Sequence, residues 1–263
     1  MSLLSRFALA AFVALAPALP AAAQDGSLTI ASGYGPSTEV PDPRAGYNGW
    51  TTNQSGVTET LMGVDYDLKL YPRLAEGIAQ SSPTTWRVTL RDGVLFHDGT
   101  PVTAQAVVDA IAPISQEGHA GHNARVAKLL DLAAMRTEGD NVVIFETNSP
   151  NAAFPWSLSD PAIAILGAAS DAYPINATGP FVFRVAVPEQ LYRVEANPAY
   201  RLGTPGLKEV RVVYNNDPSA QALAFEAGEV DMVINYPEAG FDRIKDTGAL
   251  GFSAPTAGCI SIR

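Results

Sequence analysis

The sequence predicts an α/β fold, in which strands and helices alternate along a chain of 263 residues. Residues 210–214 and 230–234 are short apolar runs of the kind that form buried strands, and a helical pattern lies between them. Strand, helix and strand in this order form a crossover unit, which is typical of α/β sheets. Apolar and polar residues also alternate at 86–90, as they do in a strand with one buried face.

The helix of the crossover unit has clear start and stop signals. Asp217 is a preferred N-cap residue, and Pro218 stands at the first helical position, where the missing N–H is tolerated. Gly228 follows the last helical residue, as glycine often does. The helical spacing predicts that the buried stripe consists of Ala220, Leu223, Ala224 and Ala227.

The first part of the chain predicts a strand at residues 28–31, followed by a long polar loop. Long loops of this kind often carry functional residues. A helix is expected at about residues 51–62. The Asp residues at 65 and 67 are typical of a turn, although a carboxylate pair also suits a metal or acid/base site.

The middle of the chain predicts further short elements. Thr103 is the expected N-cap of a helix after the turn-rich segment 90–104. A core-facing helix is expected at residues 123–136, because its apolar residues recur at helical spacing. The remaining expectations are strands at residues 141–147 and 162–166 and a short helix or turn at residues 151–157.

The first 23 residues have the pattern of a secretory signal peptide. Arg6 precedes an apolar run at residues 7–16, and the three alanines at 21–23 form a small-residue cleavage site. The run is much shorter than the roughly 20 residues that span a bilayer. We expect cleavage after Ala23 and a soluble periplasmic chain, the alternative being an uncleaved membrane anchor.

The composition is that of an acidic globular protein. The chain has 17 basic and 27 acidic residues, and removal of Arg6 with the signal takes the net charge from −10 to −11. Nucleic acid is a poor partner for such a surface. Cys259 is the single cysteine, so an intramolecular disulfide is excluded.

Several segments resemble one family of transport proteins. Residues 90–104, LRDGVLFHDGTPVTA, and residues 71–76, YPRLAE, are similar to motifs of family 5 of the extracytoplasmic solute-binding proteins of ABC importers. This family takes up peptides, nickel, opines and metal chelates. Residues 176–183, NATGPFVF, and residues 197–233 extend the resemblance, although Asn176 and Ala177 depart from the family's usual turn.

The resemblance implies a periplasmic-binding-protein-like lobe (type II, similar to cluster C) with an inserted α+β subdomain. Residues 24–50 and 177–263 would form the α/β subdomain of the first lobe, and residues 51–176 the insertion. Family members have two lobes that close on a solute, and this chain stops about where the crossing to the second lobe begins. We therefore expect the second lobe to be missing; the alternative is a complete one-lobe protein.

The resemblance also places the loop after the first strand and the start of the next helix at the mouth of the cleft. The candidate solute-binding residues there are Tyr34, Tyr47, Trp50 and Asn53. Aromatic side chains in a polar loop provide a large contact area at a low cost in entropy, and they also carry a polar group. The alternative is that Tyr47 and Trp50 only fix the loop to the core.

His119 and His122 are the other candidates, in the loop EGHAGHN. Two imidazoles three residues apart can bind a transition metal or hydrogen-bond the carboxylate of a chelate. A complete metal site needs more ligands, and His97 belongs to the family's FHDGT turn. We predict neither a resident metal nor a cofactor, and ordinary solvated histidines are the alternative.

The predicted function is transport without catalysis. The sequence lacks the nucleophile elbow, the zinc-protease helix, the phosphate-binding loop and the dinucleotide fingerprint. The partners implied by the resemblance are a small solute, of peptide or metal-chelate type, and an ABC permease in the inner membrane. The alternative is a periplasmic ligand-sensing or interaction module; a hydrolase is a weaker one.

Overall fold

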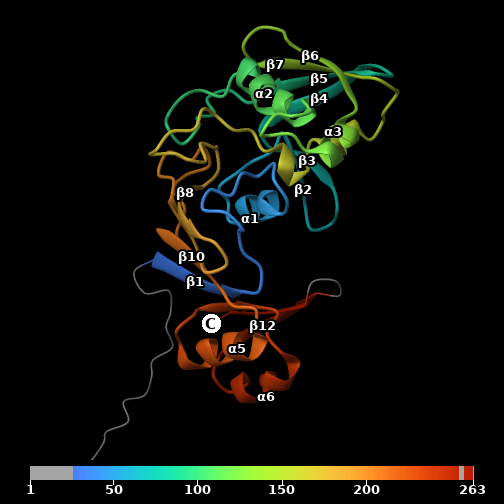
Figure 1. Cartoon of the computed structure of the whole chain (residues 1–263). Coiled ribbons are helices and arrows are strands. Elements are labelled where there is room, and N and C mark those ends of the chain that lie inside the picture. The colour runs from blue at the N-terminus through green and yellow to red at the C-terminus, as the bar shows by residue number, and fades with distance from the viewer. Residues whose placement is uncertain (1–25, 255–257, 263) are drawn as a thin grey trace, which may run out of the picture.

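The computed structural model describes residues 26–254 and 258–262, which form two larger sheets and a two-stranded ribbon, together with several helices (Figure 1). The predicted export signal, residues 1–23, lies outside the described residues. Within this part of the chain, no helix has the length and apolar character needed to cross a membrane.

Seven of the described strands form the larger sheet, in the order β12-β13-β11-β1-β10-β9-β8. β1 lies in the middle and pairs in parallel with β10 and β11, whereas the outer pairs are antiparallel. The sheet therefore joins the N-terminal strand to the last third of the chain. The strands are β1 (Ser27–Ser32), β8 (Phe181–Val187), β9 (Leu191–Ala196), β10 (Glu209–Tyr214), β11 (Met232–Ile234), β12 (Leu250–Ala254) and β13 (Gly258–Ile262).

Helix α5 (Pro218–Ala227) connects β10 to β11 and crosses over β1, so the predicted strand–helix–strand unit is confirmed. The Asp217 side chain accepts a hydrogen bond from the Ser219 N–H at 2.8 Å. Gly228 ends the helix with a φ of 78°, in the left-handed region.

The predicted buried stripe of α5 is wrong at Leu223 and Ala227, which are exposed, although Ala224 packs against the core. Leu223 is 61% exposed, whereas Gln221, Ala222 and Phe225 are buried. The ring of Phe225 packs edge-on against Tyr236, with centroids 5.7 Å apart. The largest apolar side chain of the helix thus sets which face turns to the sheet, and the alanine-rich stripe does not.

The smaller sheet contains four strands in the order β4-β5-β7-β6. The predicted strand at residues 86–90 is confirmed, and Trp86, Val88 and Leu90 point into the core. Helix α2 (Ala104–Ile111) packs on this core, and Thr103 caps it by accepting from the Ala106 N–H at 3.2 Å. The strands are β4 (Ala75–Ser82), β5 (Thr85–Leu90), β6 (Leu132–Thr137) and β7 (Val142–Thr147).

A two-stranded ribbon, β2 (Met62–Val64) and β3 (Leu70–Pro72), precedes the smaller sheet. Its connection is the predicted turn, in which Asp65 accepts hydrogen bonds from the Asp67 and Lys69 N–H groups at 2.9 and 2.7 Å. The Asp65 carboxylate is thus used by the turn itself. The tip of the ribbon, Tyr66, is fully exposed.

Two predicted helices are shorter in the structure. The helix expected at residues 51–62 is α1 (Asn48–Gln54), and Gly56, with a φ of 73°, turns the chain away after it. The helix expected at residues 123–136 is α3 (Ala124–Leu130). Asp131 ends it in the left-handed region, with a φ of 46°, and the following residues form β6.

The strand expected at residues 162–166 is also wrong, because Pro161 starts the short helix η3 (Pro161–Ile163) and irregular chain follows. The short helix expected at residues 151–157 is α4 (Phe154–Ser157). The other short helices are η2 (Ala112–Ser115), η4 (Glu238–Gly240) and α6 (Phe241–Ile244).

Gly179 lies where the chain returns to the larger sheet. A Cβ atom on it would be 2.1 Å from the Gly56 carbonyl oxygen and 2.6 Å from that of Val57. Glycine is therefore required by the close approach of two backbone segments, and not by its backbone conformation, because its φ is not in the left-handed region.

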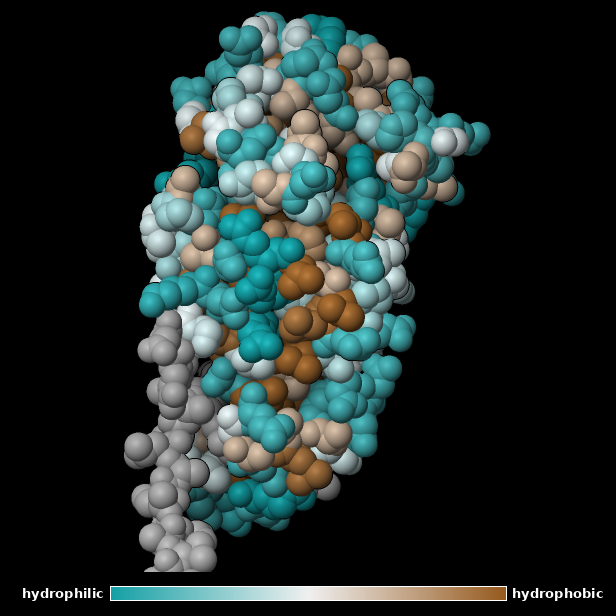
Figure 2. Space-filling model, turned by 60° about the vertical axis from the view of Figure 1, so that its left-hand side comes forward, coloured by the Kyte–Doolittle hydropathy of each residue, from teal (hydrophilic) through white to brown (hydrophobic). Residues whose placement is uncertain are grey.

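Residues from both ends of the described chain thus share the larger sheet, whereas the ribbon and the smaller sheet lie between them in sequence. This division of the chain between the sheets supports subdomain boundaries near residues 51 and 177, which we retain as a proposal. On the face of the molecule shown in Figure 2, apolar residues form a band bordered by polar ones.

Candidate functional site

Three segments from different parts of the chain meet around the start of α1, and we call their surface the rim: residues 42–50, 119–123 and 160–163. The Arg44 carbonyl accepts a hydrogen bond from Asn123 Nδ2 at 2.8 Å. A Cβ on Gly49 would lie 2.7 Å from the Pro43 carbonyl oxygen and 2.9 Å from the carbonyl carbon of Pro161. These contacts fix the loop after β1 against both neighbouring segments.

Arg44 and Asp42 form a two-pronged ion pair in this loop. Arg44 Nε donates to Asp42 Oδ1 at 2.9 Å, and Nη2 donates to Oδ2 at 2.7 Å. Burial raises the pKa of Asp42, but the hydrogen bonds and charge of Arg44 outweigh this effect and hold the pKa below its ordinary value of 3.8. The pair stays charged at neutral pH and links two residues of the loop.

Two candidate aromatic residues lie exposed on the rim. Tyr47 immediately precedes α1 and is 86% exposed, and Trp50, in the first turn, is 54% exposed. Tyr34, earlier in the same loop, is also exposed, at 80%. Since α1 is held by the contacts of Gly49, Tyr47 and Trp50 are presented on a fixed element with most of their surface free.

Asn53 has a different environment from the aromatic candidates. Its Nδ2 donates to the Thr58 carbonyl at 3.2 Å, which ties the end of α1 to the segment leading into β2. This contact serves the local fold. Asn53 as a solute-binding residue stays a prediction.

The two candidate histidines hydrogen-bond within their own loop. His119 Nδ1 accepts from the Gly121 N–H at 2.9 Å, and His122 Nδ1 lies 2.9 Å from the Ile114 carbonyl oxygen. Through Gly121 and Asn123 the loop contacts Arg44, so the histidine loop and the start of α1 are neighbours. In the described part of the chain, no group of three or more potential metal ligands is close enough to hold a metal ion.

An ion pair that the sequence did not reveal lies on the third segment of the rim. Arg125 in α3 donates through Nη1 to Asp160 Oδ2 at 2.7 Å and through Nη2 to Oδ1 at 3.1 Å. Asp160 also accepts from the Ala162 N–H at 3.0 Å and so caps η3. In the sequence, the signal for the cap of η3 was an Asp directly before a proline. No spacing in the sequence indicates that Arg125, 35 residues away, is the ion-pair partner of this Asp.

A cavity of about 570 Å³ lies beside the rim and shares Asp42 and Arg44 with it. Its floor includes Phe96 and Ile175, which are buried, and Asp109 of α2 lies at its edge. The volume falls within the range of small-molecule sites. None of the six predicted solute-binding residues lines this cavity.

His97 connects the turn after β5 to the segment before β8. Its Nε2 lies 3.1 Å from the Gly179 carbonyl oxygen, and its Nδ1 accepts from the Ala177 N–H at 3.4 Å. Burial lowers the pKa of His97 below its ordinary value of 6.5. Both ring nitrogens are used by the fold, so His97 has a structural role.

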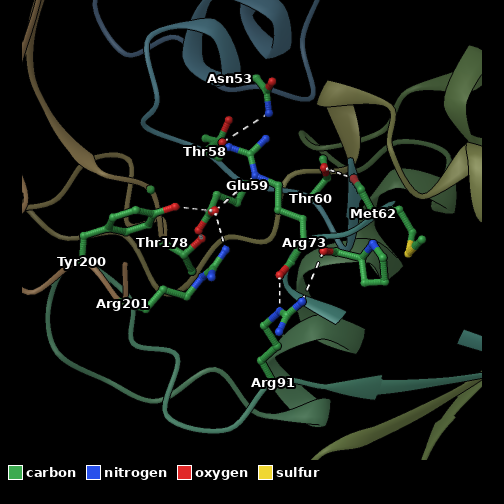
Figure 3. Close-up of polar contacts among 12 residues, drawn as sticks. Asn53, Thr58, Glu59, Thr60, Met62, Arg73, Arg91, Thr178, Tyr200 and Arg201 are labelled. Carbon is green, nitrogen blue, oxygen red and sulfur yellow. Dashed lines mark hydrogen bonds and ion pairs between the residues drawn. The ribbon is translucent and has the colours of Figure 1, made fainter. Parts of the chain in front are cut away.

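A second charged cluster lies between the two sheets and was also missed from the sequence (Figure 3). Glu59 is buried, and its Oε1 accepts from Arg73 Nε, Tyr200 Oη and Arg201 Nη2 at 3.1, 3.1 and 3.3 Å. Thr178 Oγ1 donates to Oε2 at 3.0 Å. The available sequence signal for this cluster was a carboxylate in a run of buried residues. The partners of Glu59 come from three distant segments, so the sequence did not identify them.

Solved structures of binding proteins share this fold. NikA from Staphylococcus aureus, in complex with Ni(L-His)2, superposes with a TM-score of 0.76 at 18% identity, over 86% of this chain and 47% of NikA. The oligopeptide-binding protein AppA from Bacillus subtilis, in complex with a nonapeptide, gives 0.71 at 23% identity, over 87% of this chain and 48% of AppA. The expected α/β periplasmic-binding-protein-like fold is confirmed.

The curated sequence relatives also include a binding protein. The Escherichia coli protein named "Probable D,D-dipeptide-binding periplasmic protein DdpA" is 28% identical over 171 residues, which is 60% of this chain and 32% of DdpA. The chain thus spans about half the length of the solved structures it matches, and less of this relative.

The family assignment rests on a model that covers most of the chain. The model described as "Bacterial extracellular solute-binding proteins, family 5 Middle" matches residues 69–262. This range contains all four segments that carried the resemblance in the sequence. The protein belongs to the bacterial extracellular solute-binding proteins, family 5.

Proposed function

We propose that the protein is the solute-binding component of an ABC importer, which captures a peptide, nickel or metal-chelate solute in the periplasm and delivers it to a permease of the inner membrane. Family 5 members are non-enzymatic transport components, which agrees with the predicted absence of catalysis. The Ni(L-His)2 bound by NikA supports a nickel or metal-chelate solute, and the nonapeptide bound by AppA supports a peptide.

The single observation that carries the site is the exposed aromatic pair on the rim. Tyr47 and Trp50 offer two faces to a solute from a helix that is fixed by backbone packing at Gly49. Aromatic faces bind peptide and imidazole groups alike, and the phenol and indole N–H add hydrogen bonds that orient the solute. Tyr34 and Asn53 extend the proposed site along the loop and α1.

His119 and His122 are proposed to contact the polar part of the solute. Because each Nδ1 is occupied within the loop, Nε2 is the atom that each imidazole has left for a solute. A neutral Nε2–H donates to a carboxylate, and an unprotonated Nε2 binds a transition metal. The cavity beside the rim, with its apolar floor, would accept a side chain of the same solute.

Calorimetry on the purified chain tests the rim. Nickel–histidine and a short peptide are titrated into the protein, its Tyr47→Ala/Trp50→Ala variant and its His119→Ala/His122→Ala variant. Each double variant should weaken binding of the same solute at least tenfold, or ~1.4 kcal/mol. Tyr66→Ala is the matched control, because this exposed aromatic lies on the distant β2–β3 turn. Equal affinities in all four proteins would refute the site.

Export is tested separately. Mass spectrometry of a periplasmic extract should find a mature chain that begins at Gln24, since the three alanines before it form the cleavage site. A full-length form held in the membrane would contradict the proposed address.

A further inference from the structure

A cavity of about 300 Å³ lies at the junction of the two sheets and is lined by Glu76, Arg91, Asp92 and Arg201, none of which belongs to the rim. Glu76 belongs to β4, and Arg91 and Asp92 directly follow β5, so three of the four come from the smaller sheet. Arg201 follows β9 of the larger sheet. All four side chains are charged, whereas the cavity beside the rim has an apolar floor.

The two arginines keep unused donors. Arg201 donates through Nη2 to Glu59, and its buried Nε has no hydrogen-bond partner among the described residues. Arg91 donates through Nε to the Arg73 carbonyl at 2.8 Å and through Nη2 to the Pro72 carbonyl at 3.4 Å. Figure 3 shows the Arg201 guanidinium turned toward Glu59 and the Arg91 guanidinium turned toward the Arg73 carbonyl.

The charge beneath the cavity favours an anionic group. Two guanidinium groups, those of Arg73 and Arg201, share the single buried carboxylate of Glu59. Arg91 faces backbone carbonyls, and no carboxylate pairs with it among residues 26–254. The inner side of the cavity therefore has an excess of positive charge, and guanidinium groups bind carboxylates through paired, charge-assisted hydrogen bonds.

The outer side has the opposite character. Glu76 and Asp92 are exposed, and neither has a hydrogen-bond or ion-pair partner within the described residues. The four charged groups that line the cavity thus form no ion pair with one another, although they share one space. Two free carboxylates on one side are suited to an ammonium group.

We propose that this cavity binds the zwitterion of a free α-amino acid, with its carboxylate on Arg91 and Arg201 and its ammonium group on Glu76 and Asp92. The three arginines and three acidic residues around the cavity balance, which suits a ligand without net charge. A volume at the lower end of the range for small-molecule sites favours a single amino acid over a peptide. The ligand would bridge the two sheets and stabilise their junction.

The first experiment varies the charges of the ligand. Heteronuclear NMR and thermal unfolding of the purified chain are followed during titration with L-alanine, N-acetyl-L-alanine and L-alanine methyl ester. L-Alanine should raise the unfolding temperature, as any ligand of the folded state does, and should shift the amide signals of residues 76, 91, 92 and 201. Both blocked forms should bind at least tenfold more weakly. Equal effects of all three compounds, or none with L-alanine at 50-fold molar excess or more, would overturn the proposal.

The second experiment varies the protein. Glu76→Gln/Asp92→Asn removes the two unpaired carboxylates, which make no contacts that the fold needs, and should weaken L-alanine binding at least tenfold. Asp67→Asn, at another exposed carboxylate, in the β2–β3 turn, is the control and should leave L-alanine binding unchanged. The Tyr47→Ala/Trp50→Ala variant should also bind L-alanine normally, so failure of the rim and failure of this cavity are distinguishable. Unchanged binding in the carboxylate variant would refute the site.

Discussion

Glu59 and Arg73 form an ion pair whose carboxylate has no solvent-exposed surface, with Arg73 Nε 3.1 Å from Glu59 Oε1. Removing a carboxylate from water is costly unless its charge and lone pairs are satisfied. Here Arg201, Tyr200 and Thr178 complete the set of donors. The pair therefore connects the segment before β2 with segments next to β4, β8 and β9, and it links the two sheets.

Glu59→Gln should destabilise the protein strongly. The amide keeps the size of the side chain but leaves two guanidinium groups facing a neutral acceptor. Breaking a buried ion pair typically costs about 3–5 kcal/mol, and the partial exposure of both arginines places the expected loss near 3 kcal/mol. Urea unfolding of the purified protein measures it.

The control for this substitution is an exposed ion pair. Glu138 pairs with Arg87, and both side chains are well exposed, at 54% and 38%. Glu138→Gln should change the free energy of unfolding by less than about 1 kcal/mol. If both variants lost the same small amount, the junction would not depend on Glu59.

His97 should make stability depend on pH. Burial lowers its pKa below 6.5, so the unfolded chain binds a proton at a higher pH than the folded protein does. The contribution of His97 to the free energy of unfolding should therefore be fully present above pH 6.5. It should be lost as the pH decreases from there through the lowered pKa. Protonation would also place an N–H on Nδ1 against the Ala177 N–H.

The measurement is the urea midpoint at several pH values between 5 and 8. His97→Gln should be less stable at pH 8 but should show a flatter decrease between pH 6.5 and 5 than the unaltered protein. A parallel decrease in both proteins would assign the pH dependence to other groups.

The predicted elements that were confirmed carry their signals locally. Asp217, Pro218 and Gly228 specify both ends of α5 within a dozen residues, and Thr103 does the same for the start of α2. The alternation at residues 86–90 follows from one buried face. Such elements are specified by neighbouring residues, so they can be predicted from one sequence.

The wrong predictions occur where tertiary packing determines the local structure. Residues 132–137 continue a helical pattern but pair with β7, because Asp131 takes a left-handed conformation and ends α3. Tyr47 and Trp50 stay predictions as solute-binding residues, and the structure shows that both are exposed. The ion pairs of Asp160 and Glu59 could not be found, because their partners are distant in sequence.

The apolar band of Figure 2 should cause self-association of the purified chain. Large exposed apolar surfaces are uncommon on monomeric soluble proteins and favour association. Light scattering over a series of protein concentrations should show a mass that rises above that of one chain. A constant monomer mass would show that the band is too small or too divided to drive association.

Gly179→Ala should lower stability because the methyl group would collide with backbone. The new Cβ would meet the carbonyl oxygens of Gly56 and Val57, and neither can rotate away as a side chain would. Overpacking of this kind typically costs about 1–3 kcal/mol, and backbone atoms place the expected loss at the upper end. Gly77→Ala, at a glycine of β4 with open space around it, should be neutral or stabilising by up to about 1 kcal/mol.

The observed face of α5 is tested by two truncations in the same helix. Phe225→Ala should cost about 3–5 kcal/mol, since it removes a fully buried ring that packs on Tyr236. Leu223→Ala should change the free energy of unfolding by less than about 0.5 kcal/mol, because its side chain is mostly in water. The helical spacing of the sequence alone predicts a large cost for Leu223, so urea unfolding of the two variants separates the interpretations. A larger loss for Leu223→Ala than for Phe225→Ala would mean that α5 turns its alanine-rich stripe to the sheet after all.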